Sequence, residues 1–158
     1  MRTKQIDEPF DILVIEDNPA DVRLLRLALD ETGLAYELTV IDDGAEALCF
    51  VRREGKYAAT PKPDLVVLDL NLPKKSGMEV LAALRANKEL SNTPVAVVTS
   101  SSAPLERAQV EGLRVERFIT KPPDLDDFLR IGAMLIEVLL ERQAVLSLPH
   151  LTTIRFAP

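Results

Sequence analysis

Cysteine and histidine are almost absent from this sequence, because each occurs only once among 158 residues. The single Cys49 cannot form an internal disulfide, which is typical of a protein that works in a reducing compartment such as the cytosol. The single His150 has no cysteine near it in the chain, and this disfavours a zinc site.

Long apolar runs and an excess of positive charge are lacking as well. No stretch approaches the roughly 18 apolar residues of a membrane span, and the opening MRTKQIDEP has no apolar region of a secretory signal. With 19 basic and 25 acidic residues the net charge is −6, whereas a nucleic-acid-binding face needs basic residues. We therefore expect a cytoplasmic protein with no membrane and no nucleic-acid partner.

The chain does contain a regular alternation of short apolar runs and amphipathic stretches. The apolar runs predict five strands, at residues 12–15, 36–41, 65–68, 95–98 and 115–119. The amphipathic stretches predict five helices, at about residues 19–32, 45–53, 78–86, from 104 onward and 124–142. This alternation predicts one α/β domain, a doubly wound five-stranded parallel sheet with helices on both faces.

Polar residues follow four of the predicted strands. They are Glu16 and Asp17 after the first strand, Asp69 after the third, Thr99 and Ser100 after the fourth, and Thr120 and Lys121 after the fifth. Each has an ordinary reading on its own: Asp17 as a helix cap, Asp69 as a turn residue, Thr99 as a strand end and Lys121 as a surface lysine. Because the carboxyl ends of parallel strands lie along one edge of the sheet, their coincidence predicts a shared site.

The charges at this edge predict a metal ion. The three carboxylates and one ammonium leave a local charge of −2, and two like charges about 5 Å apart repel by roughly 3 kcal/mol at an effective dielectric near 20. Ligands that are all oxygen favour Mg²⁺, or Mn²⁺, over zinc. With the metal bound, Asp69 can act as a nucleophile toward a phosphoryl group, whose oxygens Lys121, Thr99 and Ser100 are suited to hold.

The chain resembles the receiver domain of two-component response regulators over about residues 10–142. Four motifs carry the resemblance: VIEDNP, VVLDLNLPKKSG, VVTSSS and FITKPP. It implies a flavodoxin-like receiver fold with strand order 2-1-3-4-5, and phosphorylation of Asp69 by a sensor histidine kinase. The segment LDLNLPKKSG is similar to the corresponding segment of small receivers that are paired with bacterial and cyanobacterial phytochromes.

The resemblance also implies the metal ligands. Asp17 and Asp69 would bind Mg²⁺ directly, the backbone carbonyl of Asn71 would be a further ligand, and Glu16 would act largely through water. The acidic pair is Glu-Asp where most receivers have Asp-Asp. This departure leaves metal binding intact but alters its tightness.

A conformational switch is implied by the same family pattern. Thr99 would turn onto the phosphoryl group, and Phe118, which stands where many receivers have tyrosine, would follow it from an exposed to a buried position. The Lys121–Pro122 peptide bond is expected to be cis, which would aim the lysine. Asn71 and Ser101 flank the path of hydrolysis, and we expect them to set its rate.

The predicted organisation is an N-terminal extension at residues 1–9, a receiver domain at 10–142, and a tail at 143–158 with no output domain. The output would then be another protein or self-association. In the last helix we expect one core stripe, consisting of Leu125, Phe128, Leu129, Ile136 and Leu139, and a second apolar line of Ile131, Met134 and Val138. These features favour a homodimer through the fourth helix, fifth strand, fifth helix and tail. The alternative is a tail folded back on its own domain.

Two enzyme or carrier classes fit less well. A haloacid-dehalogenase-type enzyme would want an aspartate two residues after Asp69, where this chain has Asn71. A flavodoxin-like electron carrier would want a phosphate-binding loop after the first strand, where EDNPAD is acidic. The alternative that remains open is a receiver-like interaction module that is never phosphorylated.

Overall fold

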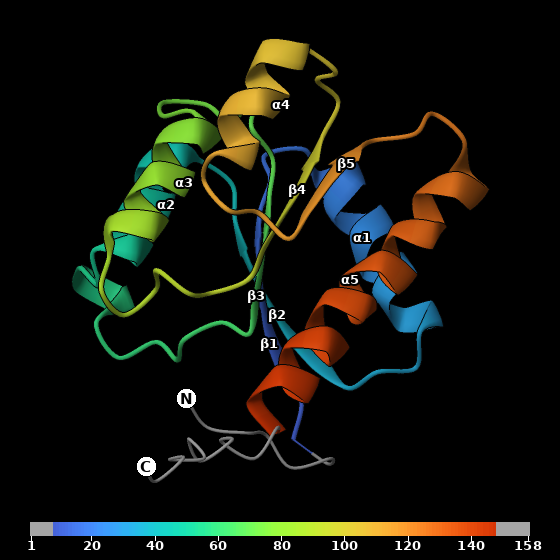
Figure 1. Cartoon of the computed structure of the whole chain (residues 1–158), viewed down its shortest axis with the longest axis horizontal. Coiled ribbons are helices and arrows are strands. Elements are labelled where there is room, and N and C mark those ends of the chain that lie inside the picture. The colour runs from blue at the N-terminus through green and yellow to red at the C-terminus, as the bar shows by residue number, and fades with distance from the viewer. Residues whose placement is uncertain (1–7, 148–158) are drawn as a thin grey trace, which may run out of the picture.

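Five parallel strands form the centre of the molecule in a computed structural model that describes residues 8–147 (Figure 1). The strands are β1 (Phe10–Ile15), β2 (Tyr36–Ile41), β3 (Leu65–Leu68), β4 (Val95–Thr99) and β5 (Arg117–Thr120). They pair in the order β2-β1-β3-β4-β5, with every neighbouring pair parallel. This arrangement confirms the predicted doubly wound sheet and its strand order.

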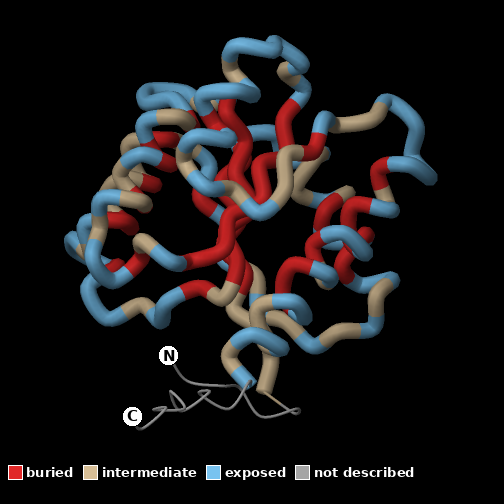
Figure 2. The backbone as a smooth tube through the Cα atoms, in the orientation of Figure 1, coloured by how far each residue is buried: buried red, intermediate tan, exposed pale blue. Residues whose placement is uncertain are grey.

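Helices cover both faces of the sheet. They are α1 (Pro19–Glu31), α2 (Gly44–Val51), α3 (Gly77–Ala86), α4 (Pro104–Glu111) and α5 (Leu125–Ser147), with a short 3₁₀ helix η1 (Gly55–Tyr57). Figure 1 shows α1 and α5 on one face and α2, α3 and α4 on the other. Figure 2 shows that the buried residues are concentrated in the strands, whereas the exposed residues lie mostly in the loops and on the outer sides of the helices.

Successive side chains along a strand point alternately into two separate hydrophobic cores, one on each face of the sheet. In β1, Ile12 and Val14 pack toward α1 and α5, whereas Leu13 and Ile15 pack toward α2 and α3. All four side chains are buried. This explains why the strand sequences are continuously apolar, since a central parallel strand has no solvent-facing side.

The predicted helix boundaries rest on side chains that do cap the helices. Asn18 Oδ1 accepts a hydrogen bond from the Ala20 N–H at 2.9 Å before α1, and Asp124 Oδ1 accepts one from the Asp127 N–H at 3.1 Å before α5. Gly33 follows α1 with φ +72°, a left-handed conformation that costs glycine little.

Some predicted boundaries were wrong. The last helix continues to Ser147 and does not end at 142, because the sequence between them holds no helix breaker. Residues 143–147 of the predicted tail are therefore helical, and residues 148–158, like residues 1–7 of the N-terminal extension, lie outside the described part of the chain. The segment after α2 contains η1, whose Tyr57 packs edge-on against the Phe50 ring at 5.4 Å between centroids.

The predicted division of apolar residues on α5 was also partly wrong. Ile131 and Val138, assigned to a second apolar line beside the core stripe, are buried in the core, and Leu125, assigned to the core stripe, is 52% exposed. The reason is that α5 packs against α1 as well as against the sheet. At Gly132 the two helices approach so closely that a Cβ atom would lie 2.1 Å from the carbonyl oxygen of Ala28.

Candidate functional site

Three strand ends meet at the ammonium group of Lys121. Lys121 Nζ donates to Glu16 Oε2 at 2.7 Å, to Asp69 Oδ2 at 2.8 Å and to Asp21 Oδ2 at 2.8 Å. Glu16 follows β1, Asp69 follows β3 and Lys121 follows β5, and Glu16 and Asp69 are only 3% and 4% exposed. Of the residues predicted to converge at the carboxyl edge, Glu16 and Asp69 therefore lie in direct contact with Lys121.

Asp69 is held by the tight turn that follows β3. Its backbone N–H donates to the carbonyl of Ile15 at 3.0 Å, and its Oδ1 accepts from the Asn71 N–H at 3.0 Å. Gly77 closes the turn by donating to the Leu70 carbonyl at 2.9 Å. A Cβ atom at Gly77 would lie 2.2 Å from the Asp69 carbonyl, so the turn requires a residue without a side chain.

The acids of this site suit a divalent cation. Glu16, Asp17 and Asp69 each offer a carboxylate oxygen, and these oxygens lie within 4.8 Å of one another. Together with Asp21 they make four carboxylates for a single ammonium, a formal charge of −3, and three of the four contact that ammonium. A dense set of oxygen ligands with excess negative charge matches the preference of Mg²⁺ and Mn²⁺.

Burial and close contact shift the pKa values of the charged groups in this site. Burial raises the pKa of Glu16 to about 7, in spite of its hydrogen bond from Lys121. Burial acts in the same direction on Asp69, but the hydrogen bonds from Lys121 and Asn71 outweigh it, and its pKa is lowered. Burial acts to lower the pKa of Lys121, but its three carboxylate partners raise it overall. Without a metal ion, the site thus tends to keep one proton, on Glu16, near neutral pH.

The hydroxyl residues at the end of β4 and in the loop after it lie at the same edge. Thr99 is completely buried, and its carbonyl accepts from the Lys121 N–H at 2.8 Å, which joins the ends of β4 and β5. Its Oγ1 accepts from the Ser101 N–H at 3.3 Å. Ser101 in turn donates its hydroxyl hydrogen bond to Glu106 in α4, while Ser100 is exposed. The Thr99 hydroxyl is therefore engaged by its own loop.

Phe118 lies half-buried on β5. The guanidinium carbon of Arg107, from α4, is 5.3 Å from the centre of its ring. Arg107 Nε also donates to Glu111 Oε1 at 3.2 Å, one turn further along α4. The aromatic residue predicted to move is thus covered by an arginine that is itself oriented by an ion pair.

A family profile described as the response regulator receiver domain matches residues 12–131. The chain belongs to this family. It is 38% identical over 123 residues to the response regulator Rcp1 of Synechocystis, an alignment that covers 78% of this chain and 84% of Rcp1.

Solved structures agree with this assignment. The phosphorylated cyanobacterial phytochrome response regulator RcpA superposes with a TM-score of 0.79 at 37% identity, covering 85% of this receiver and 96% of RcpA. The Mn²⁺-bound form of Rcp1 superposes with a TM-score of 0.78 at 37% identity, covering 84% and 96%. The receiver is therefore a two-component signalling protein homologous to phytochrome response regulators. Among residues 8–147, no helix is long and apolar enough to cross a membrane.

The predicted cis bond in the receiver was wrong. No peptide bond between residues 8 and 147 is cis, so Lys121–Pro122 is trans. The bond before proline favours trans by about 0.5–1 kcal/mol unless the surroundings require cis. Here they do not, because the backbone bond to Thr99 and the long lysine side chain already bring Nζ to Asp69.

Sequence reasoning missed Asp21. Its signal lies in EDNPAD, where a third acid follows the Glu-Asp pair in the first turn of α1. An acid at that position is usually attributed to the helix dipole, and its bond to a lysine 100 residues away in the chain becomes evident only in the fold.

Proposed function

We propose that the receiver accepts a phosphoryl group on Asp69 from a sensor histidine kinase of the phytochrome type. The observation that carries the proposal is the contact of Lys121 Nζ with Asp69 Oδ2, beside three carboxylate oxygens within 4.8 Å of one another. The homology to phytochrome response regulators supports the class of kinase.

In the proposed phosphoryl transfer, each residue of the site has a separate role. An Asp69 carboxylate oxygen attacks the phosphorus atom, an O–P bond forms, and the P–N bond to the kinase histidine breaks with its electron pair returning to the imidazole. Lys121 and the Thr99 hydroxyl hold the phosphoryl oxygens, with Ser100 as a further contact. A bound Mg²⁺ or Mn²⁺ ion, held by Asp17, Asp69, the Asn71 carbonyl and, through water, Glu16, would supply positive charge to those oxygens.

The acyl phosphate then biases the fold through β4 and β5. The new oxygens accept a hydrogen bond from the Thr99 hydroxyl and draw Thr99 away from the Ser101 N–H, which now donates to its Oγ1. This movement of Thr99 opens space for the Phe118 ring. A change of this kind shifts an existing equilibrium between two packings. Hydrolysis of the acyl phosphate resets the switch, at a rate set by Asn71 and Ser101.

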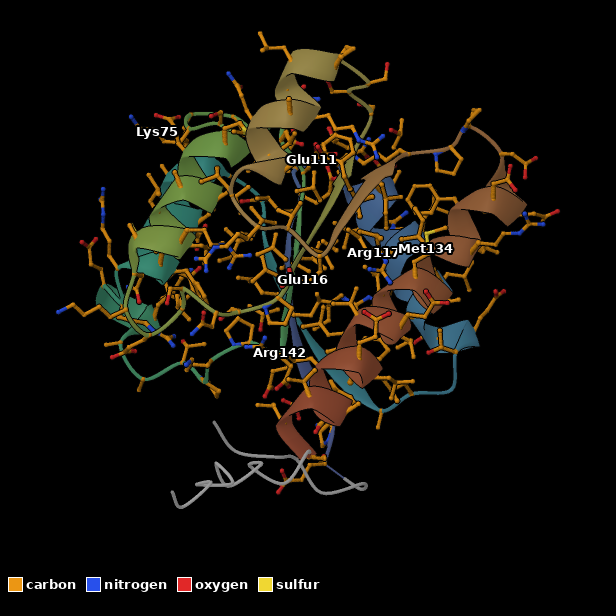
Figure 3. The ribbon with its side chains drawn as sticks, viewed as in Figure 1. Lys75, Glu111, Glu116, Arg117, Met134 and Arg142 are labelled. Atoms are coloured by element: carbon orange, nitrogen blue, oxygen red, sulfur yellow. The ribbon has the colours of Figure 1, made fainter. Side chains whose placement is uncertain are left out.

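We further propose that the output is a homodimer through α4, β5 and α5. β5 is an edge strand of the sheet. Leu105 on α4 is 72% exposed and Met134 on α5 is 39% exposed. Arg117 on β5 pairs with Glu141 of α5 at 3.0 Å, and Figure 3 labels Arg117 and Met134 on this side of the molecule. Apolar residues beside oriented charges are typical of a recognition surface.

Incubation with acetyl phosphate and Mg²⁺, followed by intact-mass measurement, tests the phosphorylation. We expect the mass of one phosphoryl group to be added to the wild-type chain and to Asp126→Ala, a control that removes an exposed acid from α5. Asp69→Ala should gain nothing. An unmodified wild-type chain would instead identify an interaction module that is never phosphorylated.

A further inference from the structure

Lys121 has more carboxylate partners than the metal site explains. Two of its acceptors, Glu16 and Asp69, also belong to the group of oxygens that lie within 4.8 Å of one another. The third, Asp21, lies outside that group but accepts at 2.8 Å. Its side chain is 20% exposed, whereas that of the lysine is 10% exposed.

We propose that Asp21 is a positioning residue that keeps the Lys121 ammonium aimed at the phosphoryl site during transfer. The inference rests on the proposed phosphorylation of Asp69. A lysine is a point charge on a flexible four-carbon stem, so its direction must be imposed by its acceptors. When Glu16 and Asp69 turn to a cation and a phosphoryl group, they become weaker acceptors for the lysine, and Asp21 remains.

Asp21 is well placed to act as such an anchor because its own helix is fixed. α1 packs against α5 at the close approach of Ala28 to Gly132, and Lys121 lies in the segment that joins β5 to α5. The bond between Asp21 and Lys121 therefore connects two elements that are already packed together. An acceptor on a packed helix defines a position more narrowly than one on a loop.

The ordinary role of an acid in the first turn of a helix is to interact with the helix dipole. That role requires no partner, yet the structure gives Asp21 a largely buried ammonium at hydrogen-bond distance. The two roles differ in one respect: a dipole effect is independent of Lys121, whereas a positioning effect requires it.

The first test measures the rate of phosphorylation by acetyl phosphate at saturating Mg²⁺, by intact mass, in a double-mutant cycle. Asp21→Ala should slow the reaction about tenfold, the size of one lost charge-assisted hydrogen bond. In a Lys121→Met background the same substitution should cause no further slowing. Asp126→Ala, which removes a first-turn acid from α5, should leave the rate unchanged.

Several outcomes of that cycle would overturn the inference. They are an unchanged rate in Asp21→Ala, equal slowing with and without Lys121, and equal slowing in Asp126→Ala. If the wild-type chain takes up no phosphoryl group at all, the proposed function itself fails, which is a distinct result.

A second test requires neither metal nor phosphate. In thermal unfolding with a chelator, Asp21→Ala should lower the midpoint when Lys121 is present. It should raise the midpoint in Lys121→Met, where Asp21 is only one more negative charge beside Glu16 and Asp69. A shift of the same sign in both backgrounds would mean that Asp21 acts on α1 alone, and would overturn the proposed pairing.

Discussion

At the scale of single residues, the two buried acids at the carboxyl edge differ in their pKa values. Glu16 and Asp69 are both buried and both contact Lys121, yet the pKa of Glu16 is raised and that of Asp69 is lowered. Each also accepts a backbone N–H at 3.0 Å, Glu16 from Asn18 and Asp69 from Asn71. The difference lies in their mutual interaction, because the charge and hydrogen bond of Asp69 raise the pKa of Glu16, whereas the hydrogen bond with Glu16 lowers the pKa of Asp69. The proposed phosphoryl acceptor therefore stays ionised, and the proton of the crowded site resides on Glu16.

This difference predicts how metal affinity depends on pH. Below a pH of about 7 the metal-free site holds a proton on Glu16, and a cation must displace it. We expect Mg²⁺ binding to weaken as the pH falls below 7, by up to about tenfold per pH unit, and to level off above it. Calorimetric titration on both sides of neutrality measures this.

Glu16→Gln is the matched control for that experiment. It keeps the size of the side chain and removes the titrating proton, so its Mg²⁺ affinity should be weaker but nearly independent of pH around 7. A wild-type affinity that is equally flat would contradict the assignment of the proton to Glu16.

The sequence predicted the residues of the site better than their connections. Glu16, Asp69 and Lys121 were identifiable because each follows its own strand, and strand ends share an edge. Asp21 was not, because it sits on a helix and owes its place to a lysine 100 positions away. The trans peptide bond before Pro122 was not predictable either. A family resemblance gives the conformation that is common in the family, and the loop of this chain differs from it.

At the scale of elements, the contact of α1 with α5 depends on a missing side chain. Gly132→Ala would place a methyl group 2.1 Å from the Ala28 carbonyl. We expect this clash to outweigh the better helix propensity of alanine and to cost about 1–3 kcal/mol of stability. Chemical denaturation measures the loss.

Gly112→Ala provides the control for this substitution. Gly112 ends α4 with a helical φ of −63°, and the nearest atom to its added Cβ is the Gln109 carbonyl oxygen, at 3.4 Å. It should therefore unfold within about 0.5 kcal/mol of the wild type. Equal losses in the two variants would mean that the close helix contact does not govern the stability.

Arg107 on α4 should hold the Phe118 ring in its present position. Removal of a cation from an aromatic face costs about 0.5–1 kcal/mol at an exposed site. Arg107→Ala should therefore shift the proposed Phe118 equilibrium toward the buried position, visible in the ring resonances by NMR. Arg107→Lys retains a cation and should shift it less. Identical spectra for wild type and Arg107→Ala would separate this arginine from the switch.

At the scale of the whole molecule, the sheet was predictable and the outer surface was less so. The four-residue run Leu65–Leu68 could only be a strand buried on both faces, and it is. The sides of α5 could not be assigned, because Ile131 and Val138 face α1 as well as the sheet. A helical pattern shows which residues share a face, but not how many neighbours that face has.

The proposed homodimer is tested by sedimentation of two variants of the phosphorylated chain. A chain cut after Ser147 keeps all of α5; it should become monomeric if the tail crosses to a second subunit, and should remain dimeric if the tail packs on its own domain. Leu105→Glu places a charge on the exposed face of α4 and should weaken the dimer in either case. A dimer that tolerates the charge at Leu105 would contradict this interface.

The length of α5 has a consequence for how the receiver can be monitored. Its 23 residues extend about 34 Å, from the loop after Lys121 back along the sheet to the opposite end of the molecule (Figure 1). A dye attached near Ser147 would leave the reacting atoms undisturbed. A change in the signal of the dye would report rotation or tilt of α5 as a whole. It would therefore distinguish a conformational change that moves the entire helix from one that is confined to the loops around the site.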